Sequence, residues 1–164
     1  MRLQLFLGIL YCSLAGSAIA QVDYKNAIGL RLGDANGITL KHHKNSTTAL
    51  EGILHSAYYG RGLSITGLYE KNQTVFGDRA FQFFYGAGAH IGFYNGGIYK
   101  VYYSNRTYTY TSSSVNLGID GIIGLEWKVP TIPFTVSADI KPVIEILHPI
   151  YGFLQGGFSI RYTF

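Results

Sequence analysis

The chain has 164 residues and a formal net charge of +4; charged residues make up 13% of the sequence and aromatic residues 15%. Soluble domains carry about 25% charged residues, so this composition is poor in charge for a surface that faces water. The basic excess is small and dispersed, which argues against a nucleic-acid partner. A single cysteine, Cys12, excludes an internal disulfide framework and a thiolate metal site.

The first 20 residues have the layout of a secretory signal peptide. A positive start is followed by an apolar run over 3–15, and residues 18–20 (Ala-Ile-Ala) form a small-x-small cleavage signal. The run is shorter than the roughly 20 residues that span a bilayer as a helix; the alternative is an uncleaved N-terminal anchor. We therefore expect residues 1–20 to be a cleaved signal peptide and residues 21–164 to form one domain.

From residue 26 onward, apolar and polar residues alternate, and Gly, Asn and Pro turns interrupt the alternation. A period of two is typical of β-strands that separate two environments. We expect eight strands, at about 26–33, 37–43, 48–59, 61–70, 81–94, 115–128, 133–145 and 153–164. Most reach the roughly 9–11 residues of a tilted transmembrane strand. The predicted fold class is all-β: a closed up-and-down antiparallel transmembrane β-barrel of about eight strands.

Two places among the first four strands are irregular. In 48–59, Glu51 and His55 share a face with Ile53, while Ser56 falls on the other face, so the register of this strand stays open. The connection at 71–80 is longer than a typical periplasmic turn of a bacterial barrel.

The clearest alternation is in 81–94. One face carries Phe81, Phe83, Tyr85, Ala87, Ala89, Ile91 and Phe93, and the other carries Gln82, Phe84, Gly86, Gly88, His90, Gly92 and Tyr94. The strands 115–128, 133–145 and 153–164 repeat this pattern. Aromatic residues near their ends, such as Trp127 and Phe164, are expected to form an aromatic girdle at one membrane interface.

The longest connection, 95–114, follows the fifth strand and is expected to be extracellular. Its aromatic and basic residues are candidates for contact with a partner: Tyr99, Lys100, Tyr102, Tyr103, Arg106, Tyr108 and Tyr110. Tyrosine-rich loops make good contact surfaces, and basic residues there suit lipopolysaccharide phosphates. The alternative is that this segment only extends its flanking strands beyond the membrane.

The placement of charge distinguishes a membrane barrel from a soluble, lipocalin-like one. In the predicted register, charged residues lie on the polar face or at strand ends, in turns and in loops, and none lies mid-strand on the apolar face. An Arg or Lys that faced lipid at the midplane would cost ~2–4 kcal/mol, so this absence is what lipid on the apolar side predicts. A soluble secreted barrel remains the alternative for location.

The polar face yields a candidate lumenal network. Its members are Arg31, Glu70, His90, Asp120, Glu126, Asp139, Lys141 and Arg161. One interpretation is an interior network of ion pairs that fills a narrow lumen, because an eight-stranded barrel is only just wide enough for side chains. The other is a polar pore or a catalytic set. A metal or acid–base role for His90 needs partners at fixed geometry, which the spacing does not supply, and we expect no metal, cofactor or catalytic residue.

Several blocks resemble a known family. The blocks "FFYGAGAHIGFY", "IDGIIGLEWKVPTIPFTVSADIKP" and the ending "GFSIRYTF" are similar to the small outer-membrane β-barrel proteins common in the Bacteroidetes group. The resemblance covers nearly the whole region after residue 20, apart from the loop at 97–114. It implies export, an outer-membrane barrel and a terminal aromatic residue read by the barrel-assembly machinery, but it supplies no catalytic residues.

These patterns lead to three hypotheses for function. The first is a monomeric structural or surface-interaction protein in the bacterial outer membrane, in contact with membrane lipids and lipopolysaccharide. The second is a narrow channel for ions or small solutes. The third is an enzyme that modifies lipid A, for which the sequence offers no supporting spacing of His and Ser.

Overall fold

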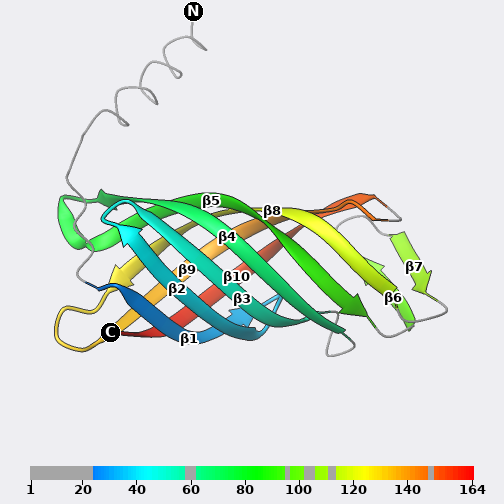
Figure 1. Ribbon diagram of the computed structural model, residues 1–164, viewed down its shortest axis with the longest axis horizontal. Helices are drawn as coiled ribbons and strands as arrows, with labels where there is room; N and C mark the ends of the chain where they lie inside the picture. The colour runs from blue at the N-terminus through cyan, green and yellow to red at the C-terminus, as the bar shows by residue number, and fades with distance from the viewer. Residues whose placement is uncertain (1–23, 58–61, 95–96, 102–105, 111–113, 148–149) are drawn as a thin grey trace, which may run out of the picture.

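Eight long strands close into an antiparallel barrel in the computed structural model, which describes residues 24–57, 62–94, 97–101, 106–110, 114–147 and 150–164 (Figure 1). The barrel strands are β1 (Asn26–Gly33), β2 (Gly37–Asn45), β3 (Thr48–Ala57), β4 (Gly62–Val75), β5 (Asp78–Tyr94), β8 (Ser114–Lys128), β9 (Phe134–Glu145) and β10 (Tyr151–Thr163). Their order around the barrel is β1-β10-β9-β8-β5-β4-β3-β2, and β2 pairs with β1 to close it. The predicted fold class is thereby confirmed, and the predicted signal peptide lies outside the described residues.

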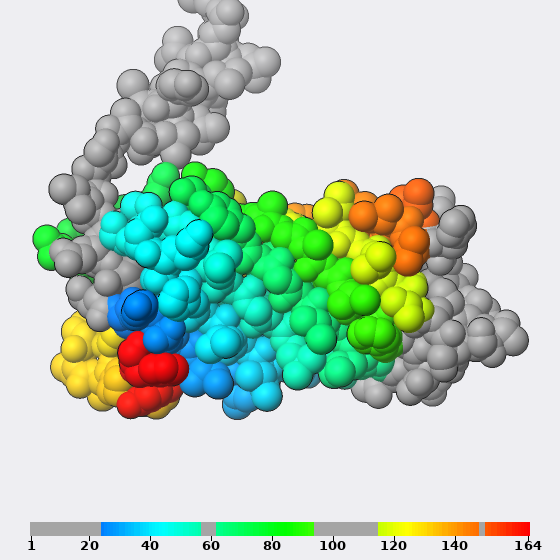
Figure 2. Space-filling model, viewed as in Figure 1, coloured from blue at the N-terminus to red at the C-terminus, as the bar shows by residue number. Residues whose placement is uncertain are grey.

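The barrel has two different ends. At one end lie Tyr24, Phe164 and the connections β2–β3, β4–β5 and β8–β9; we call it the turn end (Figure 1). The opposite end, with the connections β1–β2, β3–β4, β5–β8 and β9–β10, is the loop end. In the space-filling view the last residues of the chain lie beside the start of β1 at the turn end (Figure 2), as the pairing of Ala27 with Thr163 requires. No helix among the described residues is long and apolar enough to cross a membrane.

The connection β4–β5 is a tight turn, so the prediction of a loop at 71–80 was wrong. β4 runs to Val75 and β5 begins at Asp78, with only Phe76 and Gly77 between them. Both central residues have positive φ, 59° and 69°, as the primed turns of two-residue hairpins require. Phe is a poor residue for positive φ, which is why the sequence does not signal this turn.

The long connection 95–114 contains a second, two-stranded sheet. β6 (Gly97–Val101) pairs with β7 (Arg106–Tyr110) and with no barrel strand. The register runs from Tyr94 opposite Ser114 at the end of β5 and β8 to Gly97 opposite Tyr110 in the hairpin, which lies beyond the loop end (Figure 1). This pairing agrees with the interpretation that the segment extends its flanking strands.

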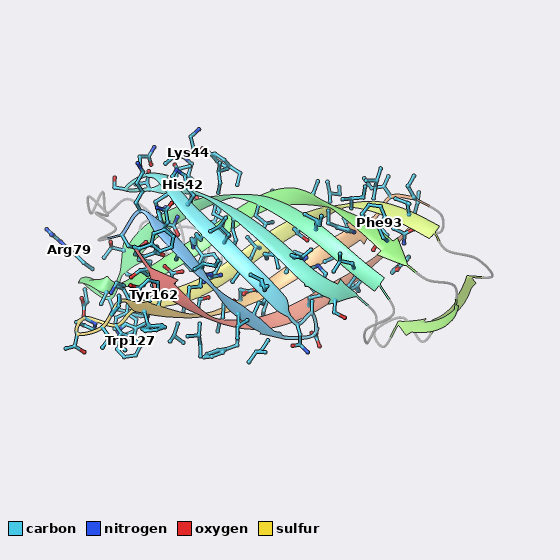
Figure 3. The ribbon with its side chains drawn as sticks, turned by 60° about the horizontal axis from the view of Figure 1, so that its bottom comes forward. His42, Lys44, Arg79, Phe93, Trp127 and Tyr162 are labelled. Atoms are coloured by element: carbon cyan, nitrogen blue, oxygen red, sulfur yellow. The ribbon has the colours of Figure 1, made fainter. Side chains whose placement is uncertain are left out.

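The two sides of the barrel wall differ sharply in chemistry. Outward-facing Leu30, Ile140 and Leu154 are 60%, 53% and 51% exposed. Lumen-facing Arg31, Lys41 and Arg161 are 1% exposed or less. Around the turn end the outward face carries Trp127 and Tyr162, and Phe93 lies near the loop end (Figure 3). The observed alternation therefore places apolar side chains outside and charged side chains inside.

Strand β3 resolves the register that the sequence left open. Glu51, Ile53 and His55 are buried and face the lumen, while Leu50 and Leu54 are exposed on the outer wall. The pattern is irregular because Ile53 is an apolar residue on the lumen side. It belongs to a small interior cluster with Leu68, Phe84 and Ile122.

Candidate functional site in the barrel interior

All eight members of the predicted lumenal network have buried side chains inside the barrel: Arg31, Glu70, His90, Asp120, Glu126, Asp139, Lys141 and Arg161. Three more charged residues are buried with them, Lys41, Glu51 and Glu145. The prediction of the network left these three out. The alternation in the sequence already places them on the polar face, so it could have identified them as members. Together these eleven residues comprise six carboxylates, four Lys or Arg side chains and His90, and His43 and His55 are also buried on the lumenal face.

Arg161 is the centre of the turn-side cluster. Its Nη2 donates to Glu51 Oε1 at 2.6 Å, and its Nη1 lies 3.3 Å from Glu126 Oε2. Nη1 also donates to Ser137 Oγ at 2.8 Å and Nε to Thr39 Oγ1 at 3.2 Å. One guanidinium thus ties strands β2, β3, β8 and β9 to β10, using the fixed fork of donors that distinguishes Arg from Lys.

Lys41 extends this cluster. Its Nζ lies 2.9 Å from Glu70 Oε2 and 3.4 Å from Glu126 Oε2, and it sits 4.3 Å above the centroid of the Phe84 ring. Glu126 therefore faces both Lys41 and Arg161. A carboxylate shared between two buried cations makes the cluster a network rather than a set of separate pairs.

Tyr24 lies just before β1 and closes the turn side of this network. Its phenol donates a hydrogen bond to the Glu126 carboxylate, and its ring meets His43 edge-on at 4.8 Å between centroids. Burial and the adjacent Glu126 carboxylate raise the pKa of Tyr24 well above its ordinary value, so the phenol keeps the proton that it donates. Tyr24 precedes the first alternating segment, so no pattern in the sequence indicated this contact.

The loop-side cluster is organised around His90. Its Nδ1 lies 2.7 Å from Asp120 Oδ2, and its Nε2 lies 3.3 Å from Glu145 Oε1. Lys141 Nζ donates to the other oxygen of Asp120 at 2.8 Å. Gly118 leaves the space for the imidazole, because a Cβ there would lie 2.3 Å from His90 Cε1.

Arg31 and Asp139 form a separate bidentate pair on the loop side. Arg31 Nη2 donates to Asp139 Oδ1 at 2.7 Å, and Nη1 donates to Oδ2. The pair reaches from β1 to β9 across β10, the strand between them. Gly157 on β10 makes this crossing possible, since a Cβ there would lie 2.2 Å from Arg31 Cζ.

An apolar layer separates the two clusters on four adjacent strands. Each of its members lies between a turn-side and a loop-side polar residue: Ile53 between Glu51 and His55, Leu68 between Glu70 and Thr66, Phe84 between Gln82 and His90, and Ile122 between Glu126 and Asp120. All four are 3% exposed or less. On these four strands the interior thus has three levels, polar, apolar and polar, along the barrel axis.

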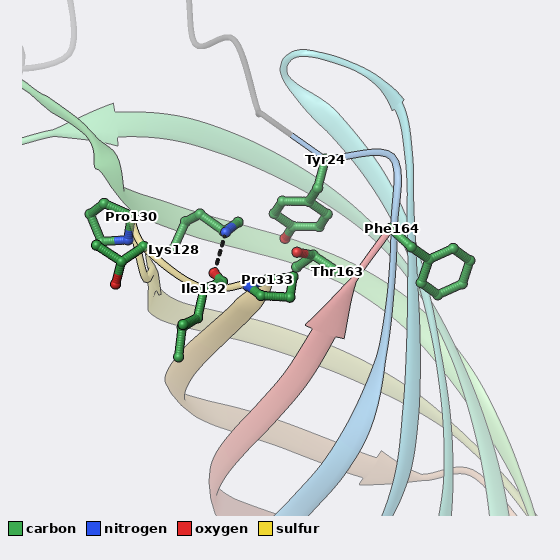
Figure 4. Close-up of a pocket in the computed structure, with 8 residues that line it drawn as sticks. Tyr24, Lys128, Pro130, Ile132, Pro133, Thr163 and Phe164 are labelled. Atoms are coloured by element: carbon green, nitrogen blue, oxygen red, sulfur yellow. Dashed lines mark hydrogen bonds between the residues drawn. The ribbon is translucent and has the colours of Figure 1, made fainter.

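A pocket of about 380 Å³ lies at the turn end, outside the ionic clusters (Figure 4). It is lined by Tyr24, Lys128, Pro130, Thr131, Ile132, Pro133, Thr163 and Phe164. Lys128 is the one Lys or Arg among these lining residues, and its Nζ donates to the carbonyls of Val129 and Ile132 at 3.0 and 2.9 Å. The turn's own carbonyls therefore hold the cation of this pocket.

The histidines inside the barrel differ in their partners, and His55 Nε2 lies 3.5 Å from Thr66 Oγ1. Over the described part of the chain, no three His, Cys, Asp or Glu side chains are grouped so that they hold a metal ion. Both ring nitrogens of His90 face carboxylate oxygens rather than a hydroxyl. A histidine held in this way does not serve as the base for a Ser or Thr nucleophile.

The loop candidates are partly described. The backbone pairs Tyr99 with Tyr108 and Gly97 with Tyr110 in the β6–β7 hairpin. Lys100 and Arg106 also lie on these strands, whereas Tyr102 and Tyr103 lie outside the described residues. The hairpin therefore brings two of the predicted contact tyrosines directly opposite each other.

Comparison with known proteins supports the architecture alone. No family model matches the chain, and no curated protein matches it. Among solved structures, the barrel is similar to one described as the crystal structure of Neisserial surface protein A (NspA), with a TM-score of 0.51 and 12% sequence identity. The similarity covers 85% of this chain and 93% of that one. At this identity the likeness shows that the two chains share a barrel fold.

Proposed function

We propose that this chain is an integral outer-membrane β-barrel with a closed lumen and a structural or surface-interaction role. The observation that carries the proposal is the inverted wall: charged side chains are buried inside, and the outer face is apolar. An apolar patch larger than a few hundred Å² is rare on a soluble monomer, and a closed barrel leaves no unpaired strand edge in lipid. A described surface protein of similar fold, NspA, agrees with this placement.

The connections suggest an orientation. Outer-membrane barrels have short periplasmic turns and longer extracellular loops. The two-residue β4–β5 turn and the short β2–β3 connection lie at the turn end, and the hairpin β6–β7 lies at the loop end. The turn end then faces the periplasm, after export by a cleaved signal peptide and insertion by the barrel-assembly machinery.

The interior supports a closed lumen rather than a channel. Ion pairs cross the lumen in two clusters, and the Ile53, Leu68, Phe84 and Ile122 layer lies between them. A hydrated ion that crossed the barrel would have to break buried ion pairs and enter this apolar layer, both of which are costly. A chain of this length and fold needs no partner to close its sheet, so we propose a monomer.

In this proposal, the loop end of the barrel makes the contacts with partners on the cell surface. The strands of the β6–β7 hairpin contain Tyr99, Tyr108 and Tyr110 together with Lys100 and Arg106. Tyr supplies contact area at low entropic cost, and the two basic residues suit phosphate groups of lipopolysaccharide. The blocks that resemble Bacteroidetes barrels support assignment of the chain to that kind of small outer-membrane protein.

Conductance and gel mobility test the proposal together. Purified barrel should insert into planar bilayers without stepwise conductance, and it should migrate faster on a gel before heating than after. Regular conductance steps from the folded protein would favour the channel hypothesis. Release of fatty acid from lipid A by the purified protein would favour the enzyme hypothesis, and a water-soluble monomer without detergent would exclude the membrane location.

A further inference from the structure

The turn end of the barrel carries an arc of cations on its outer rim. Lys25, Lys44 and Arg79 are exposed, and Lys71 is half-buried. Lys44 and Arg79 project from the same end of the barrel (Figure 3). The four cations belong to β1 and its approach, β2, β4 and β5, which lie within a continuous half of the barrel order. We propose that this cationic rim binds the headgroups of anionic phospholipids in the leaflet at the turn end; the inference rests on the proposed membrane location.

At the turn end, the described cations outnumber the described exposed acids. Asp78 is the exposed acid that the structure describes there, and its Oδ1 already accepts a hydrogen bond from the Ala80 amide at 2.9 Å. A lipid surface that meets the turn end therefore meets a positive field.

Lys71 shows how a rim cation sits at the level of the headgroups. Its Nζ donates to Thr48 Oγ1 at 2.9 Å and lies 5.5 Å from the centroid of the Tyr69 ring. Lys71 also has a side-chain hydrogen bond with the Tyr69 hydroxyl, so one of its three ammonium protons is left for an external acceptor. Tyr69 is 47% exposed on the outer wall, where Tyr marks a membrane interface. A Lys beside an interfacial Tyr reaches the phosphate layer by snorkelling.

The other half of the rim has a different composition. On β9 and β10 the same end carries Phe134 and Tyr162, followed by Phe164, with ring centroids 5.5 and 6.2 Å apart. These rings anchor the barrel at the interface but provide no positive charge. Lipid binding beside β9 and β10 should therefore not depend on headgroup charge. We expect anionic lipid to concentrate beside β1 to β5.

The chain contains its own reporter of these lipids. Trp127 is the single tryptophan, is 39% exposed on the outer wall and stacks on Phe81, two residues along β5 from Arg79. Its fluorescence is quenched by brominated lipid chains that reach it. The barrel is reconstituted into mixed vesicles in which either phosphatidylglycerol or phosphatidylcholine is brominated, and the two quenching levels give the relative binding constant of the anionic lipid.

We expect phosphatidylglycerol to bind about threefold more strongly than phosphatidylcholine, and high salt to weaken this preference. The double variant Lys71→Gln/Arg79→Gln should lose it. The charge-matched variant Lys100→Gln/Arg106→Gln changes the opposite end and should keep it. Lys128→Gln should also keep it, because the turn carbonyls hold that ammonium.

Two results would overturn the inference. Equal quenching by both lipids in the unaltered barrel would show no preference at the rim, and an equal loss in both double variants would show that only net charge matters. Neither result contradicts the proposed function, because each is measured on a barrel that has inserted into the vesicle membrane. A chain that enters vesicles of neither composition would instead contradict the proposed function, and the inference with it.

Discussion

The two halves of the barrel interior hold their charges in different ways. On the turn side, Arg161, Lys41 and Tyr24 all converge on the Glu126 carboxylate, so three strands and the segment before β1 share one network. On the loop side, Arg31 pairs with Asp139, while His90 and Lys141 share Asp120. Loss of one turn-side group should therefore disturb several strands, whereas loss of Arg31 or Asp139 should disturb a single pair.

The largest effect is expected from Arg161→Ala. The change leaves Glu51 and Glu126 buried without their guanidinium partner, and the free energy of unfolding should fall by about 5 kcal/mol. Urea unfolding of the barrel in phospholipid vesicles, followed by Trp127 fluorescence, measures it. Arg161→Lys keeps the charge without the fork and should recover only part of the loss. An unchanged unfolding midpoint would refute the network.

Arg31→Ala should lower the free energy of unfolding by less, about 3 kcal/mol, because it leaves a single carboxylate, Asp139, buried without a cationic partner. Among the described residues Arg31 and Asp139 have no further ion pair, so the double variant Arg31→Met/Asp139→Leu should regain much of this loss. The matching pair Arg161→Met/Glu51→Leu should regain little, since Glu126, Ser137 and Thr39 still lose their bonds to the guanidinium. Equal recovery in the two double-mutant cycles would remove the distinction between shared and paired charges.

A smaller effect is expected from Gly157→Ala, about 2 kcal/mol, because the new methyl overlaps the Arg31 guanidinium. Gly67→Ala is the matched control: its Cβ meets nothing within 4 Å on the outer wall, and stability should change by about 0.5 kcal/mol or less. Equal denaturation midpoints for the two variants would show that Gly157 does not make room for the pair.

The smallest effect is expected from Tyr24→Phe, about 1 kcal/mol, through loss of the phenol's bond to Glu126. Because the folded-state pKa of Tyr24 lies above that of the unfolded chain, its contribution is complete below the ordinary phenol pKa. The contribution should persist near pH 10 and disappear as the pH rises through the raised pKa. A difference between the two proteins that vanished below about pH 9 would contradict this assignment.

Much of the fold follows from the alternation in the sequence. Strand β1 was predicted with its observed bounds, and the inward or outward direction of residues such as Arg161 and Ile160 follows from their position in a period of two. The two-residue turn at Phe76 and Gly77 was missed because its backbone conformation is unusual for Phe. The pairing of β6 with β7 fits the alternative that the 95–114 segment extends its flanking strands, which the alternation alone did not decide.

The site was predicted less completely than the fold. A period of two tells which side of the wall a side chain occupies, but not which of the lumenal groups it contacts. Arg161 meets Glu51, 110 residues away in the chain, because barrel closure places β10 near β3 through β1 and β2. The roles of Tyr24, Gly118 and Gly157 are contacts between residues that are distant in the sequence. Only the closed barrel shows these contacts, so the sequence pattern did not predict them.

The inverted wall is tested most directly by single spin labels on the region after residue 20, which contains no cysteine of its own. Labels at Ile119→Cys, Ile140→Cys and Ile160→Cys in vesicles should be relaxed by oxygen and shielded from a water-soluble nickel complex. A label at the lumenal position Ser159→Cys should be reached poorly by both. Strong relaxation of the three outward labels by the nickel complex would contradict a lipid-facing wall.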